Sequence, residues 1–156
     1  MAKALEQGST AIAFTLAADG GGKVALKDFA GKPLVLYFYP KDDTTGCTKE
    51  ALDFTASASA FKKLGATVIG VSKDSVAAHD KFKKKHKLNV VLASDPEGKM
   101  IESYGSWVEK SMYGRKYMGI DRSTFLIDSK GKIARIWRKV RVPGHVEEVL
   151  EAARAL

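Results

Sequence analysis

Two continuous apolar runs constrain the fold of this chain more than any other feature of its sequence. Residues 33–39 (PLVLYFY) and 67–71 (TVIGV) are rich in β-branched and aromatic side chains. Such runs are typical of strands that are covered on both faces of a sheet. The segment between them, from Cys47 to Gly65, predicts a helix, and its final glycine suits a left-handed cap. A strand, a helix and a strand in about 39 residues predict a right-handed parallel crossover.

The rest of the chain predicts a mixed sheet. The expected elements are a helix at 76–87, a strand at 90–92, a turn at 95–98, a helix near 100–104, strands at 123–128 and 132–137, and a helix at 145–156. The two late strands flank a Ser-Lys-Gly turn and predict an antiparallel hairpin. This order is that of a thioredoxin-like domain, so we expect an α/β fold with helices on both faces of the sheet. Glycines 20–22 predict an added N-terminal hairpin, and we expect one domain over residues 1–156.

The composition excludes several classes of protein. The chain has 45% hydrophobic and 28% charged residues, and no apolar run approaches the ~20 residues that a membrane span requires. Residues 1–16 hold one lysine and lack the apolar core of a secretory signal, so we expect a soluble, cytoplasmic protein. The charge of +8 and the lysines of residues 81–87 suggest a polyanion partner. On a helix, however, those lysines spread around the solvent side, so we expect no nucleic-acid partner.

Several conspicuous side chains are expected to be structural. His79 and His86 are too far apart on their predicted helix for an i, i+4 metal pair, and we expect them to face inward as satisfied histidines. Trp107, Tyr113 and Trp137 could line a partner surface, but core packing is the expectation. No metal and no cofactor are expected.

The only cysteine, Cys47, excludes an intramolecular disulfide and every multi-cysteine metal site. It is therefore a packed small hydrophobe, an incidental thiol or a nucleophile. Its spacing to Ala51 and Phe54 places it on the core-facing stripe of the predicted helix. It also lies in the first helical turn after a central strand, where open α/β sheets place their ligand sites.

A nucleophilic Cys47 needs a cation and hydrogen-bond donors. A free thiol is only about 3% thiolate at pH 7, and lowering a thiol pKa to about 6 requires about 3.4 kcal/mol. A helix N-terminus supplies at most about 2 kcal/mol. Arg122, which precedes a predicted strand, is the candidate cation, and the alternative is a surface salt-bridge residue. Thr44 and the N–H groups of Gly46 and Cys47 are candidate donors to a leaving oxygen, while Thr44 is alternatively a plain helix N-cap or a loop turn residue.

The segment from Phe38 to Glu50, FYPKDDTTGCTKE, resembles the active-site motif P-x-x-x-T-x-x-C of the peroxiredoxins. The flanking residues 37–42 (YFYPKD) and 121–128 (DRSTFLID) resemble the Q-type branch, the bacterioferritin comigratory proteins. The likeness runs from about Ala13 to Leu150. It implies a thiol peroxidase that reduces hydrogen peroxide and organic hydroperoxides in antioxidant defence.

The resemblance also implies a role for each matching residue. Cys47 matches the peroxidatic cysteine, Thr44 and Arg122 match the residues that orient and polarise the peroxide, and Pro40 matches the proline that shields the site from water. Glu50 matches an acidic position that supports Arg122. The alternative for Glu50 is an acidic residue in the first turn of a helix, where it would favour the macrodipole.

Two departures from the Q-type pattern matter. Thr45 replaces a common proline, which suggests a less rigid loop, and Leu52 stands where many members carry a resolving cysteine. Residues 80–85 also offer no cysteine, so an oxidised Cys47 must be reduced by an external thiol such as thioredoxin, glutaredoxin or glutathione. We expect a one-cysteine enzyme that is monomeric. The alternative from another class is a non-catalytic sensor that relays the oxidation to a partner protein.

Overall fold

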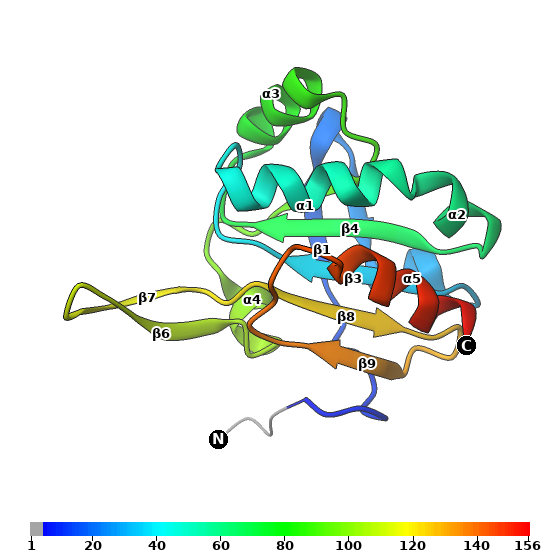
Figure 1. Cartoon of the computed structure of the whole chain (residues 1–156). Helices are drawn as coiled ribbons and strands as arrows, with labels where there is room; N and C mark the ends of the chain where they lie inside the picture. The colour runs from blue at the N-terminus through cyan, green and yellow to red at the C-terminus, as the bar shows by residue number, and fades with distance from the viewer. Residues whose placement is uncertain (1–4) are drawn as a thin grey trace.

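The computed structural model describes residues 5–156 of the chain, so the first four residues of the predicted domain lie outside the described residues. Its strands are β1 (Thr15–Ala18), β2 (Lys23–Ala25), β3 (Leu34–Phe38), β4 (Thr67–Ser72), β5 (Val91–Ser94), β6 (Trp107–Met112), β7 (Arg115–Ile120), β8 (Ser123–Ile127) and β9 (Ile133–Trp137). Its helices are α1 (Thr45–Ala56), α2 (Ala58–Lys63), α3 (Val76–His86), α4 (Lys99–Ser103) and α5 (His145–Arg154), with 3₁₀ turns at Asp19–Gly21 and Leu26–Phe29. Figure 1 shows their arrangement.

Within residues 5–156, seven strands form one mixed sheet in the order β2-β1-β5-β4-β3-β8-β9. β3 pairs in parallel with β4 and antiparallel with β8, so the predicted parallel crossover and the predicted antiparallel hairpin β8–β9 are both confirmed. The predicted N-terminal hairpin is confirmed as β1–β2. All five residues of β3 are buried, as its unbroken apolar run predicts for a central strand.

Alternate residues of the central strands supply two apolar cores, one on each face of the sheet. Val35 and Tyr37 pack with Phe54 and Phe61 beneath α1 and α2, and α5 completes this face. Leu36 packs on the other face, with α4 and the N-terminal segment. The predicted α/β class with helices on both faces is therefore confirmed. No helix in residues 5–156 has the length and apolarity needed to cross a membrane.

The predicted helix at residues 47–65 is wrong in its bounds, because the structure has two helices there. α1 begins two residues earlier, at Thr45, and Ser57 separates it from α2. The Ser57 N–H donates to both the Asp53 and Phe54 carbonyls, each at 3.2 Å, and its backbone leaves the helical region. The bend lets Phe54 and Phe61 pack together, with ring centroids 5.9 Å apart.

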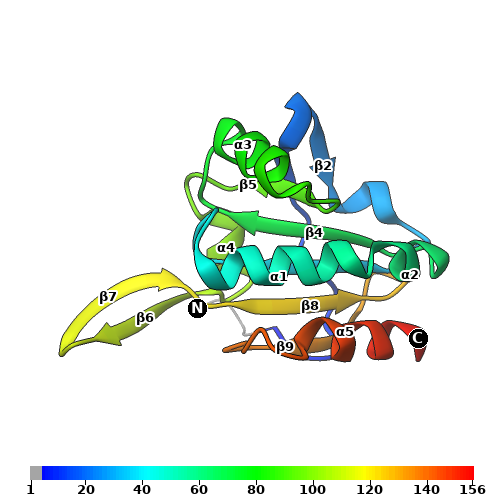
Figure 2. The same ribbon diagram turned by 45° about the horizontal axis from the view of Figure 1, so that its top comes forward.

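A hairpin formed by β6 and β7 was not predicted from the sequence. It extends away from the main sheet in two views of the molecule (Figures 1 and 2). Its side chains are largely exposed on both faces, so no alternation of apolar and polar residues marks the strands. Core packing of Tyr113 was the wrong expectation, since this side chain is 99% exposed at the hairpin tip. Trp107 and Trp137 do pack against the two cores, as expected.

Candidate active site

Cys47 is the third residue of α1, directly after the loop that leaves β3. The first backbone bond of α1 runs from the Thr48 N–H to the Thr44 carbonyl, at 2.8 Å. Thr45, Gly46 and Cys47 come before Thr48 in the chain, and the N–H groups in the first turn of an α-helix have no hydrogen-bond partner within the helix. They provide donors and a partial positive charge at the thiol. Cys47 is only 2% exposed and belongs to the core beneath α1, so it is both packed and placed for chemistry.

Arg122 brings a fixed positive charge to Cys47. It lies directly before β8, and its Nη2 donates to Cys47 Sγ at 3.3 Å, while Nη1 donates to Glu50 Oε1 at 2.7 Å. Its side chain is 17% exposed, so it is a partly buried bridge between α1 and β8 and not a surface salt-bridge residue. Although burial lowers its pKa, the charges of Glu50 and Cys47 outweigh burial and raise the pKa of Arg122.

Glu50 lies beneath Arg122, fully buried in the second turn of α1. The alternative of a first-turn acidic residue that favours the helix dipole is therefore wrong. Burial raises the pKa of Glu50 to about 7, although Arg122 opposes that rise. The carboxyl group thus fixes the guanidinium by a short hydrogen bond. Its second oxygen, Oε2, is buried without a hydrogen-bond partner, as is the hydroxyl of Tyr37 in the same core.

Gly46 leaves room for the Arg122 guanidinium. A Cβ atom at this position would lie 3.1 Å from Arg122 Nη2. Any larger side chain would therefore push the guanidinium away from its position beside Cys47. The glycine serves here as a place of close approach, since its backbone needs no unusual φ angle.

Thr44 and Pro40 are both exposed, in the loop between β3 and α1 that leads to Cys47. Thr44 is the N-cap residue of α1, as the alternative of an N-cap or loop turn residue expects, although its side chain accepts no capping hydrogen bond. Its Oγ1 instead donates to the Lys41 carbonyl at 2.9 Å, which closes the loop on itself. The loop therefore presents Thr44 toward solvent at the beginning of the helix that carries Cys47.

A buried polar network that sequence reasoning missed holds this loop from below. Asp42 accepts hydrogen bonds from the Tyr39 hydroxyl at 2.5 Å and from His79 Nδ1 at 2.7 Å. His79 Nε2 faces the Ala93 carbonyl at 2.9 Å, so both ring nitrogens face oxygen acceptors, an arrangement that favours the doubly protonated ring. Burial opposes that charge, but Asp42 and the Ala93 carbonyl raise the pKa of His79. The expectation of a satisfied structural histidine is confirmed for His79, which also holds the loop before α1.

The neighbouring loop residue is tied to the same helix. Asp43 adopts a positive φ of 61°, and its carboxylate pairs with Lys85 at 2.7 Å and with His86 at 2.8 Å, both on α3. These hydrogen bonds lower the pKa of Asp43. His86 is thus a partly exposed residue that is hydrogen-bonded to the loop, and the expectation that it faces inward is wrong. Its ring turns to the loop because Asp43 offers an acceptor there.

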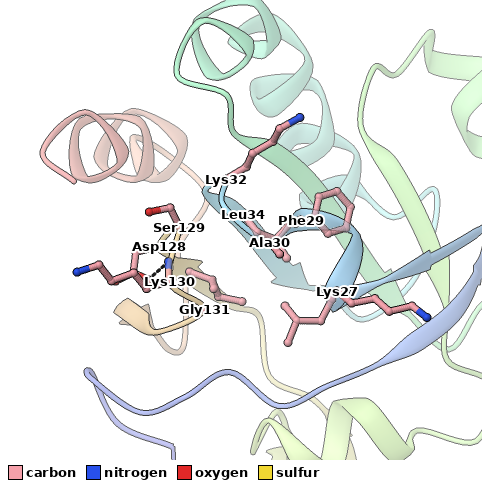
Figure 3. Close-up of a pocket in the computed structure, with 11 residues that line it drawn as sticks. Lys27, Phe29, Ala30, Lys32, Leu34, Asp128, Ser129, Lys130 and Gly131 are labelled. Atoms are coloured by element: carbon pink, nitrogen blue, oxygen red, sulfur yellow. Dashed lines mark hydrogen bonds between the residues drawn. The ribbon is translucent and has the colours of Figure 1, made fainter.

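An apolar pocket at the opposite end of β3 does not belong to this site. It has a volume of about 220 Å³ and lies around Leu34 and Phe29 (Figure 3). The ammonium groups of Lys27, Lys32 and Lys130 at its rim point away from one another. The pocket therefore offers no converging polar groups of the kind that fix a small ligand.

The comparisons with known proteins agree with this geometry. The model of the AhpC/TSA family matches residues 7–136. A Coxiella burnetii protein of the peroxiredoxin Bcp group is 51% identical over 146 residues, which cover 94% of this chain and 97% of that protein. The peroxiredoxin Bcp of Bacillus subtilis is 49% identical over 150 residues, 96% of each chain.

Solved structures extend the likeness to the fold. The bacterioferritin comigratory protein of Xanthomonas campestris, studied for alkyl peroxide reduction, superposes with a TM-score of 0.87 at 44% identity, covering 91% of this chain and 90% of its own. A mutant of the Q-type peroxiredoxin of Xylella fastidiosa gives a TM-score of 0.93 at 39% identity, covering 98% of both chains. The predicted thioredoxin-like fold is thereby confirmed. The chain belongs to the AhpC/TSA family and, within it, to the Q-type or Bcp peroxiredoxins, in a form with a single cysteine.

Proposed function

We propose that this protein is a thiol peroxidase that reduces hydrogen peroxide and organic hydroperoxides through a sulfenic acid on Cys47. The observation that carries the proposal is the hydrogen bond from Arg122 Nη2 to Cys47 Sγ, 3.3 Å long, at the N-terminus of α1. A cation and a helix N-terminus both favour the thiolate, which is the nucleophilic form of cysteine. Membership of the peroxiredoxins supports the same chemistry.

The oxidation step needs donors at the oxygen that leaves. The Cys47 thiolate attacks one peroxide oxygen, forms an S–O bond and breaks the O–O bond. The leaving oxygen departs with the electron pair as an alkoxide or hydroxide and takes up a proton. Arg122 and the N–H groups of Gly46 and Cys47 stabilise the growing charge, and the Thr44 hydroxyl joins them when it turns from the Lys41 carbonyl to the peroxide. These contacts selectively lower the transition-state energy. Glu50 orients Arg122, and Pro40 limits the access of water.

The reduction step needs a thiol from outside the chain. Cys47 is the only cysteine, and Leu52, where many relatives carry the second one, is 39% exposed on the solvent side of α1. One external thiol displaces water from the sulfenic acid and forms a mixed disulfide. A second thiol releases Cys47 and carries away the new disulfide. Thioredoxin, glutaredoxin and glutathione are the candidate reductants. All are present in the reducing cytoplasm, where we expect a single-domain, monomeric enzyme to act.

The test is NADPH-coupled consumption of peroxide by the wild type and by Cys47→Ser, with thioredoxin and its reductase or with glutathione and glutaredoxin. We expect sustained turnover by the wild type and less than about 1% of that rate in the variant, since a hydroxyl cannot form a sulfenic acid. Circular dichroism of Cys47→Ser controls for folding. A wild type that is oxidised once per molecule, without sustained consumption, would be a peroxide sensor and would contradict the proposal.

A further inference from the structure

The hairpin β6–β7 carries an unusual share of the exposed apolar surface. Within residues 5–156, four of the six exposed large apolar side chains belong to it: Met112, Tyr113, Tyr117 and Met118, which are 56%, 99%, 43% and 50% exposed. Single exposed apolar side chains are normal, but such side chains gathered on one projecting element indicate a contact surface. Methionine and tyrosine also suit such a surface, because methionine adapts its shape and tyrosine offers a polar end.

The tip of the hairpin has a tyrosine at a position whose positive φ angle disfavours a bulky side chain. Tyr113 and Gly114 form a two-residue connection between Met112 and Arg115, with φ angles of 52° and 77°. Two-residue hairpin turns with both φ angles positive strongly prefer asparagine or glycine at the first position. A bulky residue in this region costs about 1–3 kcal/mol. Tyr113 nevertheless stands there almost fully exposed, so the fold of the free protein gains nothing from its ring.

The hairpin is basic as well as apolar. Residues 107–120 contain three basic side chains, Lys110, Arg115 and Lys116, and one acidic side chain, Glu109. Lys110 lies opposite Tyr117, and Arg115 lies opposite Met112, so cationic and apolar groups alternate along one face. A partner that complements this face has acidic groups around an apolar patch.

The hairpin also projects from the catalytic end of the molecule. In both views it leaves the body at the end where α1 begins (Figures 1 and 2). Only Asp121 separates β7 from Arg122, which touches Cys47. The base is anchored, because the Asp121 N–H donates to the Ser106 carbonyl at 2.7 Å and Ser106 Oγ shares a hydrogen bond with Ser123 Oγ at 2.6 Å. A partner held by the hairpin is therefore held at the same end of the molecule as Cys47.

We propose that the β6–β7 hairpin is the docking arm for a dithiol protein with an acidic rim, which reduces the Cys47 sulfenic acid. This inference rests on the proposed function, which requires an external thiol. One thiolate of the partner attacks Cys47 Sγ and forms an S–S bond, while hydroxide leaves and takes a proton to become water. The second thiol of the partner then attacks its own sulfur in that bond, which releases the Cys47 thiol and leaves the partner oxidised. A free small thiol needs no such arm.

The test compares the wild type with Tyr113→Asn. The substitution supplies a preferred turn residue, so a purely structural role predicts an equal or more stable protein with unchanged turnover. The docking role predicts at least a tenfold lower kcat/KM for thioredoxin, the probe, with no change in turnover with dithiothreitol or in single-turnover oxidation by hydrogen peroxide. Tyr113→Phe keeps the ring and serves as the matched control, which we expect to behave like the wild type.

A second pair of variants tests the charge of the arm. Arg115→Glu should lower kcat/KM for thioredoxin, and the deficit should shrink at high salt as the charges are screened. Lys130→Glu, an equal change at the distant turn between β8 and β9, should have no effect.

Three outcomes would overturn the proposal. Unchanged thioredoxin kinetics in Tyr113→Asn would show that the tip does not contact the reductant. An equal loss with dithiothreitol would show that the substitution damages the site itself. A wild-type dimer in sedimentation that Tyr113→Asn dissociates would assign the hairpin to a second copy of this chain. If the wild type turns over with no thiol at all, the proposed function fails first, which is a separate result.

Discussion

The two sides of Cys47 are built differently. On the Arg122 side, the guanidinium that touches the sulfur is mostly covered, and it is paired in turn with the fully enclosed Glu50. On the loop side, Thr44 and Pro40 are exposed, and the buried interactions lie one layer below, between Asp42 and His79. In the proposed mechanism, the charged side acts on the thiol, whereas the loop side acts on the peroxide. Substitutions can separate these two contributions.

The difference also shows how an exposed loop can be fixed in place. Asp42 and Asp43 are both tied to α3, and the Asp42 N–H also donates to Asp74 Oδ2 at 2.9 Å. Fixed donors need no reorganisation during the reaction, which is the main advantage of a preorganised site. The loop can therefore be open to substrate and still hold Thr44 in one position.

Arg122→Met should have the largest effect, because it removes a charge that acts on both the thiol and the leaving oxygen. We expect the second-order rate constant for oxidation by hydrogen peroxide to fall at least about tenfold. This fall corresponds to a loss of ~1.4 kcal/mol of transition-state stabilisation. Alkylation of Cys47 by iodoacetamide at pH 7 should slow as well, since it follows the thiolate fraction. If the variant is alkylated and oxidised as fast as the wild type, Arg122 is structural only.

Thr44→Val should separate the loop side from the charged side. Loss of the hydroxyl should lower the oxidation rate at least about tenfold, while alkylation at pH 7 should stay unchanged because Arg122 is intact. Stopped-flow oxidation and iodoacetamide labelling measure the two effects on the same sample. Equal slowing of both reactions would mean that Thr44 acts on the thiol and not on the peroxide.

His79→Gln should weaken the support of the loop. Breaking a buried ion pair costs about 3–5 kcal/mol of folding free energy, whereas the oxidation rate should fall by less than about tenfold, because no reacting group is removed. Urea unfolding measures the first quantity and stopped-flow oxidation the second. A variant as stable as the wild type would show that the pair with Asp42 contributes nothing to the fold.

The pH dependence of stability distinguishes His79 from the other buried histidine, His145. The pKa of His79 is raised in the folded state, so its contribution is complete below the unfolded value and is lost as pH rises through the folded one. Burial lowers the pKa of His145 to about 4, so folding loses stability as pH falls from the unfolded value toward 4. His79→Gln should therefore remove only the decrease in folding stability that accompanies rising pH. His145→Gln should remove only the decrease in folding stability that accompanies falling pH.

Leu52→Cys should leave the oxidation rate unchanged and change only the fate of the sulfenic acid. Five residues along a helix place the two side chains roughly 140° apart, so the first turns of α1 must unwind before the sulfurs can meet. After one equivalent of peroxide, intact mass spectrometry should show a loss of two hydrogens, with Leu52→Ser as the control that retains one oxygen. A persistent gain of one oxygen in Leu52→Cys would show that α1 is too stable to open.

Much of the fold follows from local patterns in the sequence. The unbroken apolar run of β3 marks a central strand, and the Ser-Lys-Gly segment marks the β8–β9 hairpin. The pairing of Arg122 with Cys47 was predicted from the chemistry that a nucleophilic thiol requires. The break at Ser57 and the hairpin β6–β7 were missed, because a polar kink and an exposed ribbon leave no periodic apolar signal.

By itself the sequence determined the parallel strand–helix–strand crossover, the late antiparallel hairpin, the position of Cys47 at a helix N-terminus, the need for a cation and the dependence on an external thiol. Only the tertiary structure decided which distant side chains complete the site. Asp42 and His79 are 37 residues apart, and Glu50 and Arg122 are 72 apart, yet each pair is joined by a hydrogen bond of 2.7 Å. Periodicity and turn residues report on neighbours along the chain, whereas these pairs exist only because packing of the sheet and helices brings them together and excludes water.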